Sequence, residues 1–415
     1  MSAHRALDLR TPFPEQPTVA ILVTSFLDPR TGAVIDGGRP RIVRDVARHL
    51  VERDFAVVVL QKGLADSVVQ WETGITVHTV RCPIPTWGDP VFALRARGIT
   101  RSAALCCYAT PDDGFPFFSE RSFAIQHGVW WDGPQYAGLK GLLARILQRI
   151  RNLALCRRTK LVLCVDSNFA NYMRLLGPAS YRAARKCVYL PNYADLSRFP
   201  TPSARRVQSR FAGRKLLFLR RFEPNRGPLL FLDVCKQLKD AEFDFLAEMV
   251  GWGKEAPLVA RRIAELGLQD RVSVRSSSLD GVAKALDDAA ISVVPSLWSE
   301  GTSLSAIESI AMGVPVVATD VGGLANVVIP SFNGEVVPAD AAALARAVIR
   351  TLSSQPWYET LSANCVRMRS AFSKDRWIDR FDEILGNAGV LEPPREGPSM
   401  PAVISVPSRT AKPVA

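Results

Sequence analysis

Short apolar runs alternate along this chain with longer stretches in which apolar residues recur at helical spacing. The runs have the length of strands and end at turn residues; they lie at 19–24, 55–60, 161–165, 291–294 and 314–318. The longer stretches have the periodicity of amphipathic helices. Strands that alternate with helices in this way predict parallel sheets of the α/β class, in which ligands bind at the carboxyl ends of the strands.

The domain boundaries follow from the composition of the segments between these elements. A chain of 415 residues is long enough for two domains of ordinary size, each with its own core. Beyond Gly389 the chain is rich in proline and poor in core-forming residues, so we expect it to be disordered there. We predict a lead-in at 1–17, a first domain at 18–199, a polar linker at 200–212, a second domain at 213–372, a final helix at 373–388 and a disordered tail at 389–415.

Two glutamates mark the predicted unit of strand, turn, helix and strand between 291 and 318. Glu300 lies in the turn, and Glu308 lies on the helix that we expect from about 303 to 312. The segment 301–303 opens that helix, where unpaired N–H groups and the helix dipole favour an anion such as a phosphate. Carboxylates accept hydrogen bonds from hydroxyl groups. The segment therefore predicts a site for a phosphorylated, polyhydroxylated ligand of the nucleotide-sugar type.

The overall charge and the cysteine pattern exclude several classes of protein. A net charge of +12 fits nucleic acid, an anionic membrane surface or phosphorylated substrates, and it fits equally well a simple excess of arginine. No helix-turn-helix, zinc-finger or RNA-binding signature occurs, so we expect no nucleic-acid partner. The eight cysteines show no C-x-x-C spacing, which argues against zinc and disulfides. The N-terminus lacks a secretory apolar stretch, and we expect a cytoplasmic protein.

Residues 138–160 predict an amphipathic helix that is rich in leucine and strongly basic. No acidic residue occurs from 133 to 165. Such a helix can lie on an anionic membrane, each basic residue near the surface contributing about 1 kcal/mol. The more common arrangement is a helix packed on its own sheet, with a solvated charged face. The predicted apolar stripe comprises Leu139, Leu142, Leu143, Ile146, Leu147, Ile150 and Leu153.

Three further positions have the chemistry of a ligand site. A predicted strand ends in His127, and histidine is the side chain most easily poised for proton transfer near neutral pH. A structural histidine is the common alternative. The pair Gly37 and Gly38, between the first strand and its helix, allows the backbone to approach a ligand closely, although a simple turn also explains it.

A basic segment follows the first strand of the second domain. Arg220, Arg221 and Arg226 come directly after the apolar run 215–219. When the bond between a sugar and a diphosphate breaks, negative charge grows on the phosphate oxygens. Positioned cations stabilise that state more than the ground state. The segment therefore predicts a diphosphate contact.

The stretch from Glu300 to Gly323 resembles the signature of retaining glycosyltransferases of the GT-B fold, family 4. The two glutamates are separated by seven residues, and Gly-Val-Pro-Val-Val-Ala-Thr-Asp-Val-Gly-Gly follows them. The basic segment is similar to the family's Gly-Arg-Leu…Lys-Gly. Arg226 stands where lysine is usual, and Arg220 replaces a glycine.

The resemblance implies two Rossmann-like domains that face each other across a cleft. It implies a nucleotide-sugar donor held mainly by the second domain, an acceptor glycan held mainly by the first, and a last helix that crosses back. It also implies retention of anomeric configuration, with no metal and no other cofactor. The implied contacts are Glu308 to the ribose; Glu300 with Gly301, Thr302, Ser303 and Leu304 to the sugar; Arg221, Arg226, Gly37 and Gly38 to the diphosphate; and His127 to the sugar.

Two other classes of function stay open. A nucleotide-sugar epimerase uses a related architecture, but the pattern from Glu300 to Gly323 argues against it. A non-catalytic nucleotide-sugar-binding subunit or scaffold is favoured by Arg220 and by Trp252, both departures from the family pattern. From the basic helix alone, we expect a lipid-linked acceptor in cell-surface polysaccharide or glycolipid biosynthesis, with the enzyme peripheral on the cytoplasmic face of the membrane.

Overall fold

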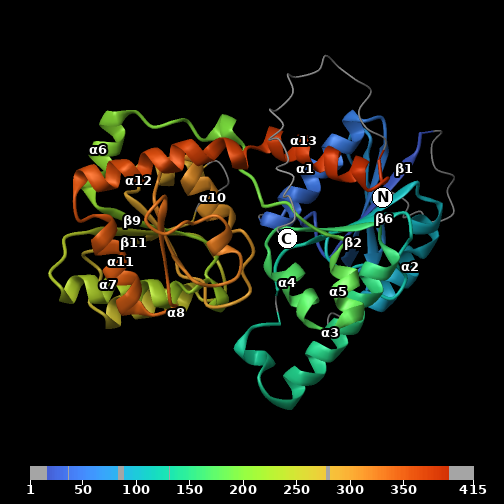
Figure 1. Ribbon diagram of the computed structural model, residues 1–415, viewed down its shortest axis with the longest axis horizontal. Coiled ribbons are helices and arrows are strands. Elements are labelled where there is room, and N and C mark those ends of the chain that lie inside the picture. Colours follow the sequence, from blue (N-terminus) through green and yellow to red (C-terminus); the bar gives the residue numbers. More distant parts are fainter. Residues whose placement is uncertain (1–15, 36, 83–87, 130, 277–280, 392–415) are drawn as a thin grey trace, which may run out of the picture.

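The computed structural model describes residues 16–35, 37–82, 88–129, 131–276 and 281–391. Two sheets, each covered by helices, lie side by side in these residues (Figure 1). The predicted α/β class is therefore confirmed. The end of the predicted lead-in, Gln16 and Pro17, precedes the first strand directly, and residues 1–15 lie outside the described part of the chain.

The first sheet has eight strands in the order β3-β4-β2-β1-β5-β6-β7-β8. All neighbouring pairs are parallel except β3 and β4. The central strands are buried on both faces, which is why they read as continuous apolar runs. The strands are β1 (Thr18–Val23), β2 (Ala56–Gly63), β3 (Ser67–Glu72), β4 (Ile75–Arg81), β5 (Leu105–Tyr108), β6 (Ser122–Gln126), β7 (Leu161–Cys164) and β8 (Cys187–Tyr189).

Five α-helices belong to this first sheet. α1 carries the helical apolar spacing read from the sequence, and its apolar residues pack into the core of the domain. The helices are α1 (Gly38–Glu52), α2 (Gly88–Ser102), α3 (Gly138–Arg158), α4 (Asn168–Leu175) and α5 (Pro178–Ala184).

The second sheet is entirely parallel and has the order β11-β10-β9-β12-β13-β14. From β9 the chain adds strands on one side of the sheet, β10 and β11, and then on the other side, beginning with β12. The point between β9 and β12 is thus a topological switch point, where ligands bind in open α/β sheets. The strands are β9 (Lys215–Leu219), β10 (Leu246–Val250), β11 (Val272–Arg275), β12 (Ile291–Val294), β13 (Val316–Thr319) and β14 (Gly334–Val337). The helices are α6 (Ala204–Gly213), α7 (Pro228–Asp240), α8 (Ala256–Glu265), α9 (Gly281–Asp287), α10 (Leu304–Ala311), α11 (Ala341–Thr351) and α12 (Gln355–Met368).

The predicted linker at 200–212 differs from the structure, because α6 occupies most of it. Val207 and Phe211 pack against the core of the second domain. Arg210 is almost fully buried, and its guanidinium donates to the carbonyls of Asp287 at 2.7 Å and Met312 at 2.9 Å. Sequence reasoning missed this helix because its many polar residues conceal a narrow apolar stripe.

The last helix, α13 (Lys374–Asn387), crosses from the second domain to the first (Figure 1). Phe381 is fully buried in the core beneath the first sheet, 5.7 Å from Phe123 between ring centroids. The disordered tail predicted from residue 389 begins too early, because Leu391 is buried in the same core. Residues 392–415 lie outside the described part of the chain.

The helix predicted at 138–160 is present as α3, but the expected packing of its apolar stripe on the sheet is wrong. Leu153 packs against the core of the domain, but the other six residues of the stripe face solvent, and α3 packs on its domain through the opposite face. Within the described residues, no helix has both the length and the apolar content needed to cross a membrane.

Phe381→Ala should lower the free energy of unfolding of the first domain by about 3–5 kcal/mol, because a large buried ring is removed from a packed core. Urea unfolding followed by far-UV circular dichroism measures the change. Asp379→Ala, at an exposed position of the same helix, is the control and should have little effect. Equal midpoints for wild type and Phe381→Ala would contradict the anchoring role of α13.

Candidate functional site

The loop between β12 and α10, residues 295–303, lies at the switch point and touches the first domain. We call it the Glu300 loop. A Cβ atom on Gly301 would lie 3.0 Å from the His127 carbonyl oxygen and 2.8 Å from Val165 Cγ2. A Cβ on Gly128 would lie 3.1 Å from the Gly301 nitrogen. A side chain at either position would therefore force the neighbouring domain to shift, and the backbone of Gly128, with φ of +110°, also favours glycine.

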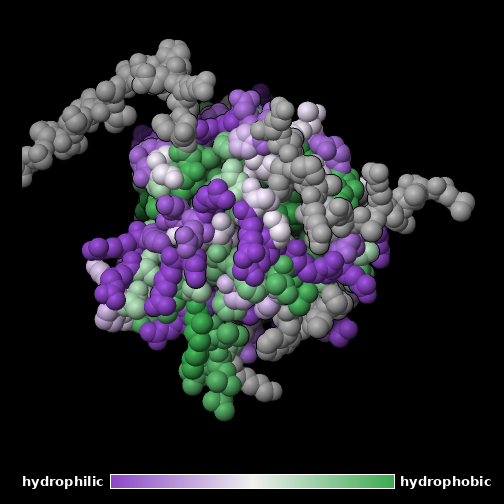
Figure 2. Space-filling view, turned by 90° about the vertical axis from the view of Figure 1, so that its right-hand side faces the viewer, coloured by the Kyte–Doolittle hydropathy of each residue, from purple (hydrophilic) through white to green (hydrophobic). Residues whose placement is uncertain are grey.

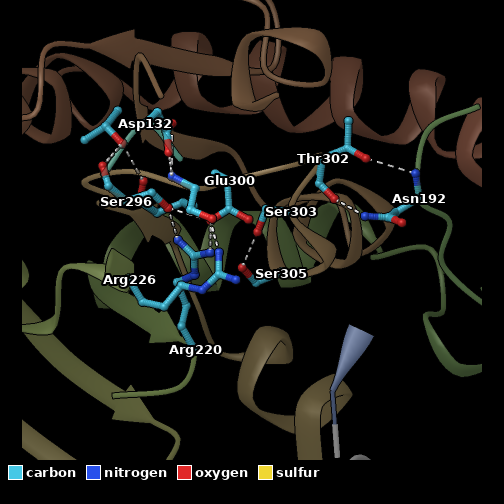
Figure 3. Close-up of polar contacts among 12 residues, drawn as sticks. Asp132, Asn192, Arg220, Arg226, Ser296, Glu300, Thr302, Ser303 and Ser305 are labelled. Atoms are coloured by element: carbon cyan, nitrogen blue, oxygen red, sulfur yellow. Dashed lines mark hydrogen bonds and ion pairs between the residues drawn. The ribbon is translucent and has the colours of Figure 1, made fainter. Parts of the chain in front are cut away.

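Hydrogen bonds hold the Glu300 loop against the first domain (Figure 3). The Thr302 hydroxyl donates to the Val165 carbonyl at 2.9 Å and accepts from the Asn192 N–H at 2.9 Å. The Asn192 amide also donates to the Thr302 carbonyl. On the other side, the Ser299 N–H donates to the Asp132 carboxylate at 3.1 Å. The loop thus joins the ends of three segments of the first domain.

Backbone N–H groups at the start of α10 are unpaired although the loop is buried. Gly301, Thr302 and Ser303 are all buried, and Leu304 is half-buried. Across the part of the chain that the structure describes, none of these four N–H groups donates a hydrogen bond to a backbone carbonyl outside the helix. Buried orphan donors at a helix N-terminus are costly unless a ligand pairs them. Their position favours an anionic group.

Glu300 is buried in a cluster of cations. Its Oε2 atom accepts from Ser296 at 2.6 Å, from Arg226 at 2.5 Å and from Arg220, and all three side chains converge on it (Figure 3). Burial alone would raise the pKa of Glu300, but the guanidinium groups of Arg220 and Arg226 lower it to about 2. Glu300 is therefore ionised throughout the neutral range.

Arg220 acts inside this cluster. Its side chain is only 5% exposed, and it bonds Ser296 as well as Glu300. The arginine that replaces the family's glycine is thus a buried partner of the first glutamate, and it holds that carboxylate in place.

Glu308 forms an ion pair with the other domain. Its Oε1 atom lies 2.5 Å from Arg41 Nη1, and the two side chains are 5% and 14% exposed. Arg41 lies in the first turn of α1, and Glu308 lies in the middle of α10. This ion pair connects the first helix of one domain to the central helix of the other.

A second cation of α1 approaches the same region. Partial burial and the nearby cations Arg226 and Arg39 lower the pKa of Arg221. Arg39 therefore lies near Arg221 across the domain interface, and these two cations, with Arg226 paired to Glu300 beside Arg221, suit an anionic group.

Sequence reasoning missed Arg39 and Arg41, although a signal was available. The first turn of α1 contains no acidic residue and these two arginines. Cations are unfavourable at a helix N-terminus, where the dipole is positive. Their presence there indicates that an anion or a carboxylate from elsewhere compensates them.

Of the predicted glycine pair, Gly38 meets the opposite domain. A Cβ atom there would lie 3.0 Å from the Leu304 side chain, at the start of α10. Gly37 is the N-cap of α1, and an added Cβ would meet only Pro40. The structure thus brings Gly38 against the side chain of Leu304, the first residue of α10.

His127 follows β6 and lies beside the Glu300 loop. Burial and the charge of Arg39 lower its pKa to about 3, so the imidazole is neutral at pH 7. Its Nε2 atom is buried and has no partner among the described residues. A neutral ring with a free nitrogen suits a hydrogen bond to a substrate hydroxyl better than proton exchange near neutral pH.

Asp166, two residues before α4, also lies at the domain interface. It accepts the Asn168 N–H at 2.7 Å, as a cap does. A Cβ atom on Gly323 would lie 2.5 Å from the Asp166 Cβ, so the second domain touches this side chain. Burial, with a smaller effect of the Glu300 charge, raises the pKa of Asp166 to about 6.

A pocket of about 460 Å³ opens beside the Glu300 loop. Its lining comes from both domains: Gln135 and Tyr136 from the segment before α3, and Glu223, Pro224, Asn225, Lys254, Trp298 and Ser299 from the second domain. Among the described residues no cluster of histidine, cysteine or acidic side chains could hold a metal ion, and metal independence stays a prediction.

The second domain of this chain matches a known protein family. Residues 213–354 match the family model described as glycosyl transferases group 1. D-inositol 3-phosphate glycosyltransferase of Geodermatophilus obscurus is 29% identical over 89% of each chain. Residues 213–354 thus carry the sequence pattern of the group 1 glycosyltransferases, and a glycosyltransferase relative aligns along most of the chain.

Solved structures share the fold of this chain. Sucrose-phosphate synthase of Thermosynechococcus elongatus superposes with a TM-score of 0.73 at 20% identity, over 89% of this chain and 98% of that one. HepE of Anabaena, solved with UDP-glucose, gives 0.67 at 17% identity, over 89% and 100%. The predicted GT-B fold is confirmed.

The structure brings most of the predicted site residues together. Glu300, its loop, His127 and Gly38 meet at the interface, with Arg221 and Arg226 beside them. Arg226 differs from the expectation because its guanidinium is bound to Glu300. The roles of these residues toward a donor remain predictions.

Glu300→Gln should lower the free energy of unfolding by on the order of 3–5 kcal/mol at pH 7, because buried Arg220 loses its ionised partner. The folded pKa of Glu300 is lowered to about 2, below the ordinary unfolded value. The carboxylate therefore stabilises the fold above an unfolded pKa of about 4.3, and its contribution is lost as the pH falls through the folded pKa.

Urea midpoints measured at several pH values test this prediction. The gap between wild type and Glu300→Gln should stay constant from neutral pH to about 5 and narrow below about 4. Glu120→Gln is the control, because Glu120 pairs with Arg158 at 3.1 Å on the exposed surface. Its effect should stay below about 1 kcal/mol. A gap for Glu300→Gln that does not narrow in acid would contradict the ionised cluster.

Proposed function

We propose that this protein is a retaining glycosyltransferase that moves a sugar from a nucleotide-diphosphate sugar to a hydroxyl group of a glycan or glycolipid acceptor. The observation that carries the proposal is the buried Glu300 loop. Its unpaired N–H groups and its ionised carboxylate lie beside a group of like-charged arginines. Binding of a diphosphate would pair the N–H groups and neutralise the charge of the arginines. The complex of HepE with UDP-glucose supports this donor class.

The diphosphate would lie between Arg39 and Arg221, against the N-terminus of α10. Arg226 would contribute charge from its place beside Glu300. When the bond between the anomeric carbon and the phosphate oxygen breaks, these groups stabilise the growing negative charge. Arginine cations in this role require no metal ion.

The ribose would bind Glu308, whose carboxylate accepts hydrogen bonds from two hydroxyl groups. Arg41 occupies that carboxylate at 2.5 Å. Donor binding therefore requires Arg41 to release Glu308, either by a change of rotamer or by separation of α1 from α10. The transferred sugar would then contact Glu300, the backbone of the loop and the free nitrogen of His127.

Transfer would proceed on one face of the sugar. The acceptor oxygen forms its bond to the anomeric carbon on the face from which the phosphate leaves, and a phosphate oxygen takes the acceptor proton. Glu300 is held by three partners, which favours binding over nucleophilic attack. The acceptor would enter through the pocket that Gln135 and Tyr136 line. We place this activity at the cytoplasmic face of a membrane, in polysaccharide or glycolipid synthesis.

A non-catalytic nucleotide-sugar-binding protein is the second candidate. Arg220 favours it, because its guanidinium takes up the Glu300 carboxylate that would otherwise face the sugar. The two candidates share donor binding and differ in turnover.

One of UDP, GDP and ADP should raise the melting temperature without Mg²⁺, because a ligand that binds only the folded state stabilises it by about 2.7 kcal/mol at a hundredfold excess over its Kd. Glu308→Gln should lose most of this response. Glu335→Gln is the matched control, a buried glutamate of the same domain that pairs with Arg350 at 2.8 Å. Thermal unfolding with each nucleotide is the measurement.

The same preparation distinguishes the two candidates. Release of nucleoside diphosphate from the matching sugar donor, with a product of unchanged anomeric configuration by NMR, is expected of the retaining enzyme. An inverted product would contradict retention. Binding without turnover on glycan and glycolipid acceptors would favour the binding protein, and no response to any nucleotide would overturn both.

Arg39→Met should weaken nucleoside diphosphate binding by roughly 10-fold or more, since a charge-assisted hydrogen bond contributes about 1.5–3 kcal/mol. The loss should be smaller for the nucleoside monophosphate, which has one phosphate fewer. Arg48→Met, on the same helix at a residue paired with Glu72 at 2.6 Å, should bind like wild type. Isothermal titration calorimetry measures the affinities of wild type and of the two variants for the nucleoside diphosphate and the monophosphate. An Arg39 variant with wild-type affinity would remove Arg39 from the site.

A further inference from the structure

The helix α3 packs on its domain with most of its apolar stripe facing solvent. The buried face consists of small and polar residues with two apolar ones near the C-terminal end: Gly141, Gln148, Asn152, Leu155 and Cys156. Gln148 donates to Asn152 at 3.2 Å and to Asp112 at 3.3 Å, so this packing is partly polar. The face that the hydrophobic effect would normally bury is thus the one left free.

The exposed stripe forms a continuous apolar surface. We call it the α3 face and define it by Leu139, Leu142, Leu143, Ile146, Leu147 and Ile150. Leu139 is 73% exposed and Leu143 is 60% exposed. The helix protrudes at the lower edge of the molecule in Figure 1, and Figure 2 shows a hydrophobic projection at the same edge. Large contiguous apolar patches on a protein surface mark interaction sites.

Basic residues flank the α3 face. At 100° per residue, Arg149 lies on one side of the stripe and Arg158 on the other. Both are exposed; Arg149 also donates to the Leu176 carbonyl, and Arg158 pairs with Glu120. No acidic residue occurs from 133 to 165. An apolar stripe between cations matches a surface that is apolar inside and anionic at its boundary.

We propose that the α3 face docks this protein on an anionic membrane surface. The leucine and isoleucine side chains enter the boundary between headgroups and acyl chains, and Arg149 and Arg158 contact the anionic headgroups. Charge decides between this occupant and a second copy of the chain. Two α3 helices in contact would bring their basic side chains together, and α3 itself carries no acidic residue to compensate Arg149.

Docking through α3 would place a lipid-linked acceptor at the site, and this part rests on the proposed function. The segment just before α3 carries Gln135 and Tyr136, which line the pocket beside the Glu300 loop. Asp132 of the same segment accepts from Ser299 in that loop at 3.1 Å. A membrane held by the α3 face therefore lies next to the segment that borders the proposed acceptor entrance.

Co-sedimentation with vesicles tests the docking. Wild-type protein should bind equimolar phosphatidylcholine and phosphatidylglycerol vesicles and bind pure phosphatidylcholine vesicles at least roughly 10-fold more weakly. The double variant Leu143→Asp, Ile146→Asp should lose binding to the anionic vesicles by at least roughly 10-fold. Leu64→Asp is the matched control and should bind like wild type. Leu64 is 90% exposed and lies between β2 and the edge strand β3, at the other end of the sheet from β8.

Two further measurements keep the result interpretable. The double variant Arg149→Gln, Arg158→Gln should bind anionic vesicles more weakly than wild type. The binding that remains should depend less on salt concentration than wild-type binding, because it comes from the apolar side chains. Thermal stabilisation by the nucleoside diphosphate should be unchanged in every variant, which excludes unfolding. If no nucleotide stabilises any form while vesicle binding behaves as stated, the donor proposal fails and the docking stands.

Three outcomes would overturn the docking. Equal binding of wild type to both vesicle types would exclude the anionic surface. Full binding by the Leu143→Asp, Ile146→Asp variant would exclude the α3 face. A wild-type dimer in light scattering that the same variant converts to a monomer, without vesicle binding by either form, would assign the face to a second copy of this chain.

Discussion

A buried carboxylate is stable only if cations and hydrogen-bond donors surround it, because leaving water costs an ion several kcal/mol. Glu300 meets this requirement through Arg220, Arg226 and Ser296. The requirement orders the loop that holds Glu300, and the ordered loop in turn presents unpaired N–H groups at the start of α10. The electrostatics of one side chain thus shape the whole candidate site.

The interface between the domains depends on the same loop. Thr302 bonds the first domain on one side and Ser299 bonds Asp132 on the other. The ion pair between Arg41 and Glu308 adds a contact that the proposed ribose would have to replace. The contact between the two domains is therefore stabilised by groups that a donor would also use, such as Glu308. Donor binding would for this reason change the relative position of the domains.

The helix α3 illustrates a different constraint. Its polar face packs on the domain, where Gln148 and Asn152 are buried and bonded to each other. Its apolar face carries the cost of exposure to water unless another surface covers it. One face of α3 thus holds the helix on its domain, and the other face presents an apolar surface to the solvent.

The sequence by itself determined the α/β class and the pair Glu300 and Glu308, since strand period and helix spacing are local properties. Only the tertiary structure decided which partner each charge meets. Arg41 reaches Glu308 from a position 267 residues away in sequence. It also decided which face of α3 is buried, because an amphipathic pattern defines two faces and long-range packing selects between them.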